Sequence, residues 1–174
     1  MRDGAWDSGG ARGATAPGRD RSLTGTKILV VEDSPSARKL MQELLLRLGV
    51  TLPDLRLSST VVEALQLFAQ WKPDIVFVDL QLRPPPDLTA AQIAAQPSVP
   101  NAPKNGAELA VQLLAREPSL KVVVCSASET DGTAVADLVR QGKVKAIVKP
   151  VLAAKVQEVL AAFASPPEPA GRRR

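Results

Sequence analysis

Four short apolar runs in the sequence are each followed directly by polar or charged residues. The pair Glu32–Asp33 follows KILVV, Asp79 follows IVFV, Ser126 follows KVVVC, and Lys149 follows KAIV. Strands of an open parallel sheet place their carboxyl ends at one edge, and ligands bind at that edge. Any one of these residues could merely cap a helix or complete a turn. Together, at four strand ends expected to surround one crevice, they predict a functional site.

The three carboxylates of this set indicate a metal ion and a phosphate. Converging carboxylates repel one another, so either their pKa values rise or a cation holds them. Ligation by oxygen alone selects Mg²⁺ or a similar hard ion. A carboxylate beside Mg²⁺ is a competent nucleophile toward phosphorus and would form an aspartyl-phosphate. Lys149 and Ser126 would then offer a positive charge and a hydrogen-bond donor to the phosphoryl oxygens.

The composition excludes several other kinds of site. The 174 residues include no histidine, which excludes nucleophilic sites with a histidine base and metal sites with histidine ligands. The single cysteine, Cys125, can form neither a disulfide within the chain nor a thiolate zinc cluster. The glycine motifs of P-loop and dinucleotide-binding proteins are absent. Chemistry is therefore left to carboxylates, hydroxyls, amides and lysines.

The net charge of +4 suggests nucleic acid, but most of it lies at the two ends of the chain. Residues 1–26 carry four arginines against three aspartates, and residues 165–174 carry three arginines against one glutamate. The segment between them is nearly balanced. No basic face for binding nucleic acid is therefore predicted on the folded body.

The site residues need a scaffold, and the apolar pattern predicts an alternation of strands and helices. The predicted strands are Lys27–Val31, Leu55–Ser58, Ile75–Val78, Lys121–Cys125 and Lys145–Val148. A run such as IVFV, apolar throughout, is typical of a strand buried on both faces. Alternating strands and helices predict an α/β fold, a flavodoxin-like doubly wound five-stranded parallel sheet with helices on both faces.

Five helices are expected between and after these strands. The first would begin at Ser34–Pro35 and end at Gly49, with an apolar face of Ala37, Leu40, Met41, Leu44, Leu45 and Leu48. The second is marked by Val61, Ala64, Leu65 and Phe68 and must end before Pro73. The third and fourth are Gly106–Arg116 and Thr133–Gln141, and the last would bury Leu152, Val156, Val159, Leu160 and Phe163.

Three segments fall outside this alternation. Residues 1–26 are predicted to be a disordered leader and residues 165–174 a disordered basic tail. Residues 83–104 contain six prolines and no glycine, and are interpreted as an insertion whose composition favours a solvated excursion over a binding motif. No apolar stretch is long enough for a signal peptide or a membrane span, so a cytoplasmic protein is expected.

Four strings, KILVVEDSPSAR, DIVFVDLQL, CSAS and VKP, occur in an order that resembles the receiver domain of two-component response regulators. The resemblance covers residues 27–164, and its specificity comes from four separated motifs that agree. It implies that Asp79 is the phosphoacceptor, that the phosphoryl donor is a histidine kinase or a histidine phosphotransfer protein, and that the reaction requires Mg²⁺.

The same resemblance assigns the remaining site residues. Asp33 would bind Mg²⁺ directly, Glu32 through water, and Gln81 through its backbone carbonyl. Ser126 would be the switch hydroxyl and Lys149 the lysine that pairs with the phosphate.

The sequence departs from the family pattern in two places. Ala146 occupies the position, three residues before the lysine, where the family carries an aromatic residue that moves with the switch hydroxyl. The segment 83–104 lengthens the loop after the phosphoacceptor, so that Asn105–Gly106, which resembles the turn that ends this loop, comes late. Phosphoacceptance is expected to be intact, whereas the usual output mechanism is not.

Several alternatives remain beside this interpretation. Phosphotransferring hydrolases with an aspartate nucleophile carry a second aspartate two residues later, where this chain has Gln81. A pseudo-receiver that serves only as an interaction module, or the receiver of a phosphorelay or hybrid kinase, would share the fold. The preferred interpretation is a stand-alone, non-enzymatic response regulator, with neither a DNA-binding output domain nor a membrane anchor, that signals through an unknown protein target.

Overall fold

A computed structural model describes residues 23, 25–83, 102–127 and 135–164. The predicted tail and most of the predicted leader and insertion therefore lie outside the described residues. Leu23 belongs to the predicted leader, yet it is buried and belongs to the same core cluster as Met41 and Leu45. The buried core therefore begins before the first strand, earlier than the composition indicates.

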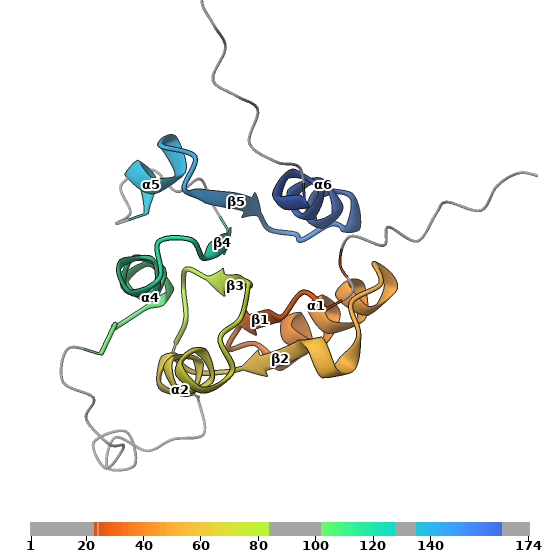
Figure 1. Ribbon diagram of the computed structural model, residues 1–174, viewed down its shortest axis with the longest axis horizontal. Helices are drawn as coiled ribbons and strands as arrows, with labels where there is room; N and C mark the ends of the chain where they lie inside the picture. The colour runs from red at the N-terminus through yellow and green to blue at the C-terminus, as the bar shows by residue number, and fades with distance from the viewer. Residues whose placement is uncertain (1–22, 24, 84–101, 128–134, 165–174) are drawn as a thin grey trace, which may run out of the picture.

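The centre of the fold is a sheet of five parallel strands (Figure 1). They are β1 (Ile28–Val31), β2 (Leu55–Ser58), β3 (Ile75–Asp79), β4 (Lys121–Ser126) and β5 (Val144–Val148). Their order across the sheet is β2-β1-β3-β4-β5. From β1 the chain passes to β2 on one side of β1 and then to β3 on its other side. The carboxyl ends of β1 and β3 therefore form a topological switch point. The predicted flavodoxin-like α/β fold is confirmed.

Helices cover both faces of the sheet (Figure 1). On one side lie α1 (Pro35–Arg47) and α6 (Ala153–Ala164), and on the other lie α2 (Val61–Trp71), α4 (Gly106–Arg116) and α5 (Ala136–Arg140). A short 3-10 turn, η2 (Leu52–Asp54), precedes β2. No helix in the described part of the chain is long and apolar enough to cross a membrane.

The core has two halves, one on each face of the sheet, because successive strand residues point to opposite faces. Val76 and Val78 of β3 pack toward α2 and α4, whereas Ile75 and Phe77 pack toward α1 and α6. All five residues of β3 are buried, as predicted for a strand that is covered on both faces. Asp79 ends this strand and is thus held in a rigid part of the fold.

Local signals in the sequence set the helix ends near the site. The Ser34 hydroxyl accepts a hydrogen bond from the Ala37 N–H, and Pro35 follows as the first helical residue. The Asn105 side chain caps α4 in the same way by accepting from the Glu108 N–H. Gly49 has φ +97°, a conformation that non-glycine residues avoid, and it ends α1 as predicted.

Two details of the helix predictions are wrong, and a third lies partly outside the described residues. Leu40 is 54% exposed, because it lies one residue step of about 100° from Met41, at the margin of the face that α1 turns to the sheet. Leu152 is 58% exposed and precedes α6, where its carbonyl accepts the N–H groups of Lys155 and Val156. The helix predicted at Thr133–Gln141 is described only as α5, and residues 133–134 lie outside the described part.

Candidate functional site

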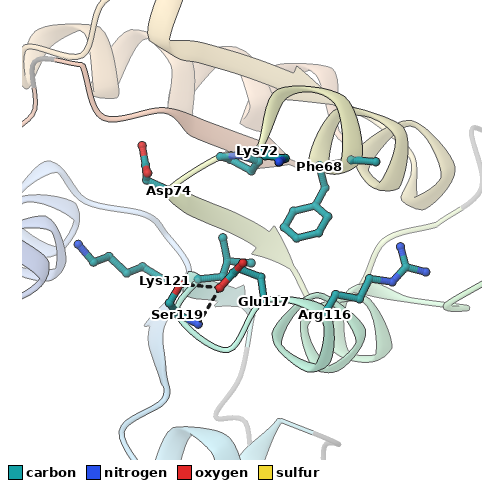
Figure 2. Close-up of a pocket in the computed structure, with 10 residues that line it drawn as sticks. Phe68, Lys72, Asp74, Arg116, Glu117, Ser119 and Lys121 are labelled. Atoms are coloured by element: carbon teal, nitrogen blue, oxygen red, sulfur yellow. Dashed lines mark hydrogen bonds between the residues drawn. The ribbon is translucent and has the colours of Figure 1, made fainter.

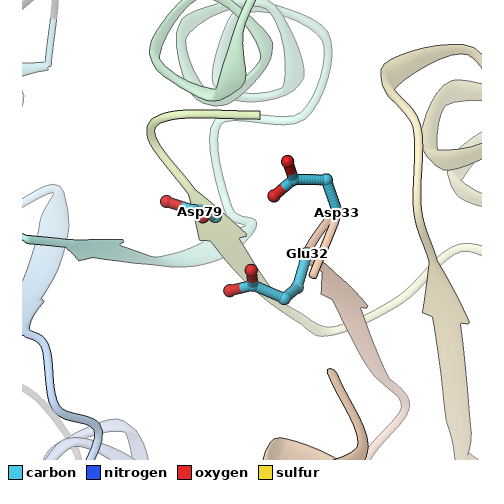
Figure 3. Close-up of side chains that lie close together, drawn as sticks. All are labelled: Glu32, Asp33 and Asp79. Atoms are coloured by element: carbon cyan, nitrogen blue, oxygen red, sulfur yellow. The ribbon is translucent and has the colours of Figure 1, made fainter. Parts of the chain in front are cut away.

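Three carboxylates converge at the carboxyl edge of the sheet, between β1 and β3 (Figure 3). Glu32 and Asp33 follow β1 directly, and Asp79 is the last residue of β3. One oxygen from each carboxylate lies within 4.8 Å of the others. Glu32 and Asp79 are each 7% exposed, so two of the three are buried. The structure therefore brings together the three acids that the sequence placed at neighbouring strand ends.

Lys149 joins this acidic cluster from the end of β5. Its Nζ donates to Glu32 Oε2 and to Asp79 Oδ2, each at 2.8 Å. Burial of the ammonium lowers the pKa of Lys149, but the hydrogen bonds to Asp79 and Glu32 outweigh burial and leave that pKa above its ordinary value. Lys149 is therefore a stable cation that already bridges two of the acids.

Ser126 and Cys125 complete the neighbourhood of Asp79 on β4. Ser126 is 5% exposed, and its carbonyl accepts a 2.7 Å hydrogen bond from the Lys149 N–H, which places the two residues side by side. Cys125 pairs with Asp79 across the sheet, and burial raises the pKa of its thiol to about 12. A thiol in this state is not a nucleophile at neutral pH.

The backbone around the cluster orients each carboxylate. The Gln81 N–H donates to Asp79 Oδ1 at 3.1 Å, the Ser34 N–H to Glu32 Oε1 at 3.3 Å, and the Arg83 N–H to Asp33 Oδ2 at 3.3 Å. A carboxylate offers about four lone-pair directions, so each retains acceptor capacity beyond these bonds. A hard divalent ion fits this set of oxygen donors. Binding of the metal by the backbone carbonyl of Gln81 stays a prediction.

The pKa of Glu32 is raised above its ordinary value. Burial is the largest cause and the charge of Asp79 adds to it, whereas the hydrogen bond from Lys149 opposes both. The folded protein thus binds a proton at Glu32 more tightly than the unfolded chain does. Ionisation of Glu32 consequently costs stability above the ordinary glutamate pKa, and this cost disappears at lower pH where both states are protonated.

We expect Glu32→Gln to raise the melting temperature of the metal-free protein at neutral pH, because glutamine keeps an acceptor for Lys149 without the buried charge. The gain should shrink as the pH falls through the raised pKa and vanish below pH 4.5, the ordinary value for glutamate. Thermal unfolding in EDTA across this pH range checks the prediction. Glu63→Gln, a change at the first turn of α2, is the control. A lower melting temperature for Glu32→Gln at every pH would contradict it.

Helix α4 begins in contact with the backbone of Asp79. A Cβ atom added to Gly106 would overlap the Asp79 carbonyl oxygen and lie 2.7 Å from its carbonyl carbon. The resemblance alone predicts a turn at Asn105–Gly106, and nothing in the spacing of the sequence indicates this close approach. The glycine lets α4 pack directly against the residue at the centre of the cluster.

Ala146 lies on β5 opposite Val124, and both Ala146 and the nearby Val148 are exposed. An alanine side chain cannot fill or vacate a packing site there as an aromatic ring would. The chain after β4 is described only as far as Ala127. The expected departure from the usual output mechanism therefore stays a prediction.

A hollow lies at the opposite, amino edge of the sheet (Figure 2). It has a volume of about 500 Å³ and is formed where α2 and α4 end and where β3 and β4 begin. Lys72 and Arg116 lie at helix carboxyl ends, where cations complement the helix dipole. Hydrogen bonds from Ser119 hold the pKa of Glu117 below its ordinary value. Helix ends and hydrogen bonds thus account for these groups, whereas the converging carboxylates lie at the carboxyl edge of the sheet.

Comparisons with known proteins agree with this fold. The chain is 32% identical over 99 residues to the chemotaxis protein CheY of Listeria monocytogenes, an alignment that spans 57% of this chain and 66% of that protein. Over 136 residues it is 23% identical to the chemotaxis protein CheY of Thermotoga maritima, covering 78% of this chain and 95% of the relative. No family model matches the sequence.

Solved structures give the same result. A CheY-like response regulator receiver domain from Methylobacillus flagellatus superposes with a TM-score of 0.58 at 26% identity, over 79% of this chain and 98% of that one. The receiver domain of NtrX from Brucella abortus has a TM-score of 0.59 at 24% identity, over 79% of this chain and 97% of that one. Both similarities extend over nearly the whole of the smaller domains.

Proposed function

The chain belongs to the CheY-like receiver-domain family of response regulators, and from this premise we propose that Asp79 accepts a phosphoryl group in a Mg²⁺-dependent reaction. The donor would be a histidine kinase or a histidine phosphotransfer protein, and the phosphorylated protein would signal by contacting another protein. The observation that carries this proposal is the convergence of Glu32, Asp33 and Asp79 within 4.8 Å, with Lys149 bonded to two of them.

The contacts of Asp79 support a role as the nucleophile. Its carboxylate is fixed by the Gln81 N–H on Oδ1 and by Lys149 on Oδ2. An Asp79 oxygen would form the new bond to phosphorus while the bond between phosphorus and the donor's histidine nitrogen breaks, and the electron pair leaves with that nitrogen. The product is an acyl phosphate on the carboxyl edge of the sheet.

Glu32, Asp33 and Asp79 would hold the metal ion, with the Gln81 carbonyl as a further oxygen ligand. When bound, Mg²⁺ supplies positive charge that neutralises the phosphoryl oxygens. Lys149 would pair with a phosphoryl oxygen, because its ammonium is already 2.8 Å from Asp79 Oδ2. Ser126, beside Lys149 at the end of β4, would donate its hydroxyl hydrogen to another.

We expect millimolar Mg²⁺ to raise the melting temperature of the wild-type protein and to have much less effect on Asp33→Ala. An ion that binds only the folded state, at a concentration ten times its dissociation constant, stabilises that state by about 1.4 kcal/mol. This corresponds to a rise in melting temperature of roughly 3–5 °C for a chain of this size. The same variant should take up little phosphoryl group from acetyl phosphate, whereas the wild type should gain one in the presence of Mg²⁺. Thermal unfolding and intact-mass analysis supply the two measurements.

Asp54→Ala is the matched control, since Asp54 lies in η2 before β2, at the amino edge of the sheet. It should respond to Mg²⁺ and to acetyl phosphate as the wild type does. An undiminished Mg²⁺ response in Asp33→Ala would contradict the metal assignment. A wild type that binds Mg²⁺ but takes up no phosphoryl group, even from a kinase, would instead favour a receiver that acts only as an interaction module.

A further inference from the structure

Arg38 contacts the backbone of the acidic pair, a contact that the spacing of the sequence does not reveal. Its Nη1 donates to the Glu32 carbonyl at 2.6 Å and to the Asp33 carbonyl at 3.3 Å. One guanidinium nitrogen thus bridges two successive carbonyls in the segment that carries two of the three carboxylates. These are charge-assisted bonds, and the shorter one is at the strong end of the range.

The position of Arg38 in α1 makes this contact informative. It is the fourth residue of the helix, near the positive end of the helix dipole, where a cation is unfavourable. The first turn of α1 contains no acidic residue that would offset its charge. The next residue, Lys39, is by contrast directed to solvent, with a side chain that is 76% exposed and pairs with Glu43. The Arg38 side chain is therefore held by its contacts with the turn after β1 and not by interactions within the helix.

The two bonds constrain the direction of the carboxylates. Fixing a carbonyl fixes the plane of its peptide, because that unit is rigid, and adjacent peptide planes set the direction of the side chain between them. The peptides after Glu32 and Asp33 are both fixed by the same nitrogen. The direction of the Asp33 Cα–Cβ bond is therefore set, and its carboxylate lies toward Asp79 (Figure 3).

We propose that Arg38 is a positioning residue of the metal site, which holds Glu32 and Asp33 in the orientation that a divalent cation requires. This inference rests on the proposed function for the identity of that cation, Mg²⁺. The charge of Arg38 alone would oppose a cation, so geometry and charge predict opposite effects of its removal. A lysine at this position would retain the charge but lose the planar fork, and would reproduce the contact only in part.

The experiment measures the Mg²⁺ dissociation constant of the full chain by titration calorimetry at fixed ionic strength, with thermal unfolding in EDTA alongside. We expect Arg38→Gln to weaken Mg²⁺ binding about tenfold, the lower end of the range for residues that orient metal ligands. Arg38→Lys should lie between this variant and the wild type. Lys39→Gln, which removes the neighbouring charge, should bind Mg²⁺ as the wild type does.

The other possible outcomes contradict either the positioning role of Arg38 or the metal site itself. Unchanged Mg²⁺ affinity in Arg38→Gln with a lower melting temperature would make Arg38 a purely structural residue. Tighter binding in that variant would show that its charge outweighs its geometry. If Arg38→Gln does not fold, Arg38→Lys decides by the same criterion, and affinity equal to the wild type overturns the proposal. A wild type without measurable Mg²⁺ affinity would contradict the metal site of the proposed function itself.

Discussion

Asp79→Asn is expected to abolish phosphoryl uptake completely. The amide has nearly the shape of the carboxylate, and its single oxygen can still accept one of the two hydrogen bonds that Lys149 and Gln81 donate to separate oxygens of Asp79 in the wild type. It is not a nucleophile toward phosphorus, so the bond that carries the phosphoryl group cannot form. Stability should change little, since the variant also removes one of three mutually repelling charges. Intact-mass analysis after incubation with acetyl phosphate and Mg²⁺ measures the loss.

Asp74→Asn is the matched control for this variant. Asp74 precedes β3 as Asp79 ends it, so the control makes the same change at the other end of the same strand. Its Oδ2 accepts the Lys27 N–H, a bond that the asparagine oxygen can replace. Uptake by Asp74→Asn should equal that of the wild type. Uptake by Asp79→Asn at the wild-type level would place the nucleophile on another residue.

The fold and the acidic cluster could be predicted because each depends on one simple rule. Strands buried on both faces are apolar throughout, so runs such as Ile75–Val78 identify the strands of a parallel sheet without information on their partners. Parallel strands share a carboxyl edge, which is why residues as distant in sequence as Glu32 and Asp79 could be expected to meet. The structure confirms the parallel sheet and brings these acids together.

The contacts around the cluster could not be predicted, because they depend on how elements approach one another. The spacing of Arg38 marks it only as a helix residue, and its bonds to the turn after β1 depend on the angle at which α1 leaves that turn. Leu40 has apolar spacing and is still exposed, since a helix buries only the stripe that faces the sheet. The approach of Gly106 to Asp79 joins segments separated by the predicted insertion and leaves no pattern in the sequence.

Gly106→Ala is expected to destabilise the protein and to impair phosphoryl uptake, although helix propensity alone predicts the reverse. Alanine is favoured over glycine within helices by about 0.5–1 kcal/mol. Here the added Cβ would overlap the Asp79 carbonyl oxygen and lie 2.9 Å from Val78 Cγ1, so backbone must move. Overpacking of this kind costs roughly 1–3 kcal/mol, or about 3–10 °C in melting temperature. Thermal unfolding and phosphoryl uptake from acetyl phosphate are the measurements.

The control, Gly49→Ala, separates loss of stability from damage to the site. Gly49 has φ +97° and no atom within 4 Å of an added Cβ, so alanine there costs about 1–2 kcal/mol through backbone strain alone. Its phosphoryl uptake should match the wild type at temperatures where both are folded. Gly106→Ala should lose uptake under the same conditions, because relief of the overlap displaces the backbone of Asp79. Equal uptake by the two variants would show that α4 can move away without disturbing the acceptor, and that this glycine serves packing only.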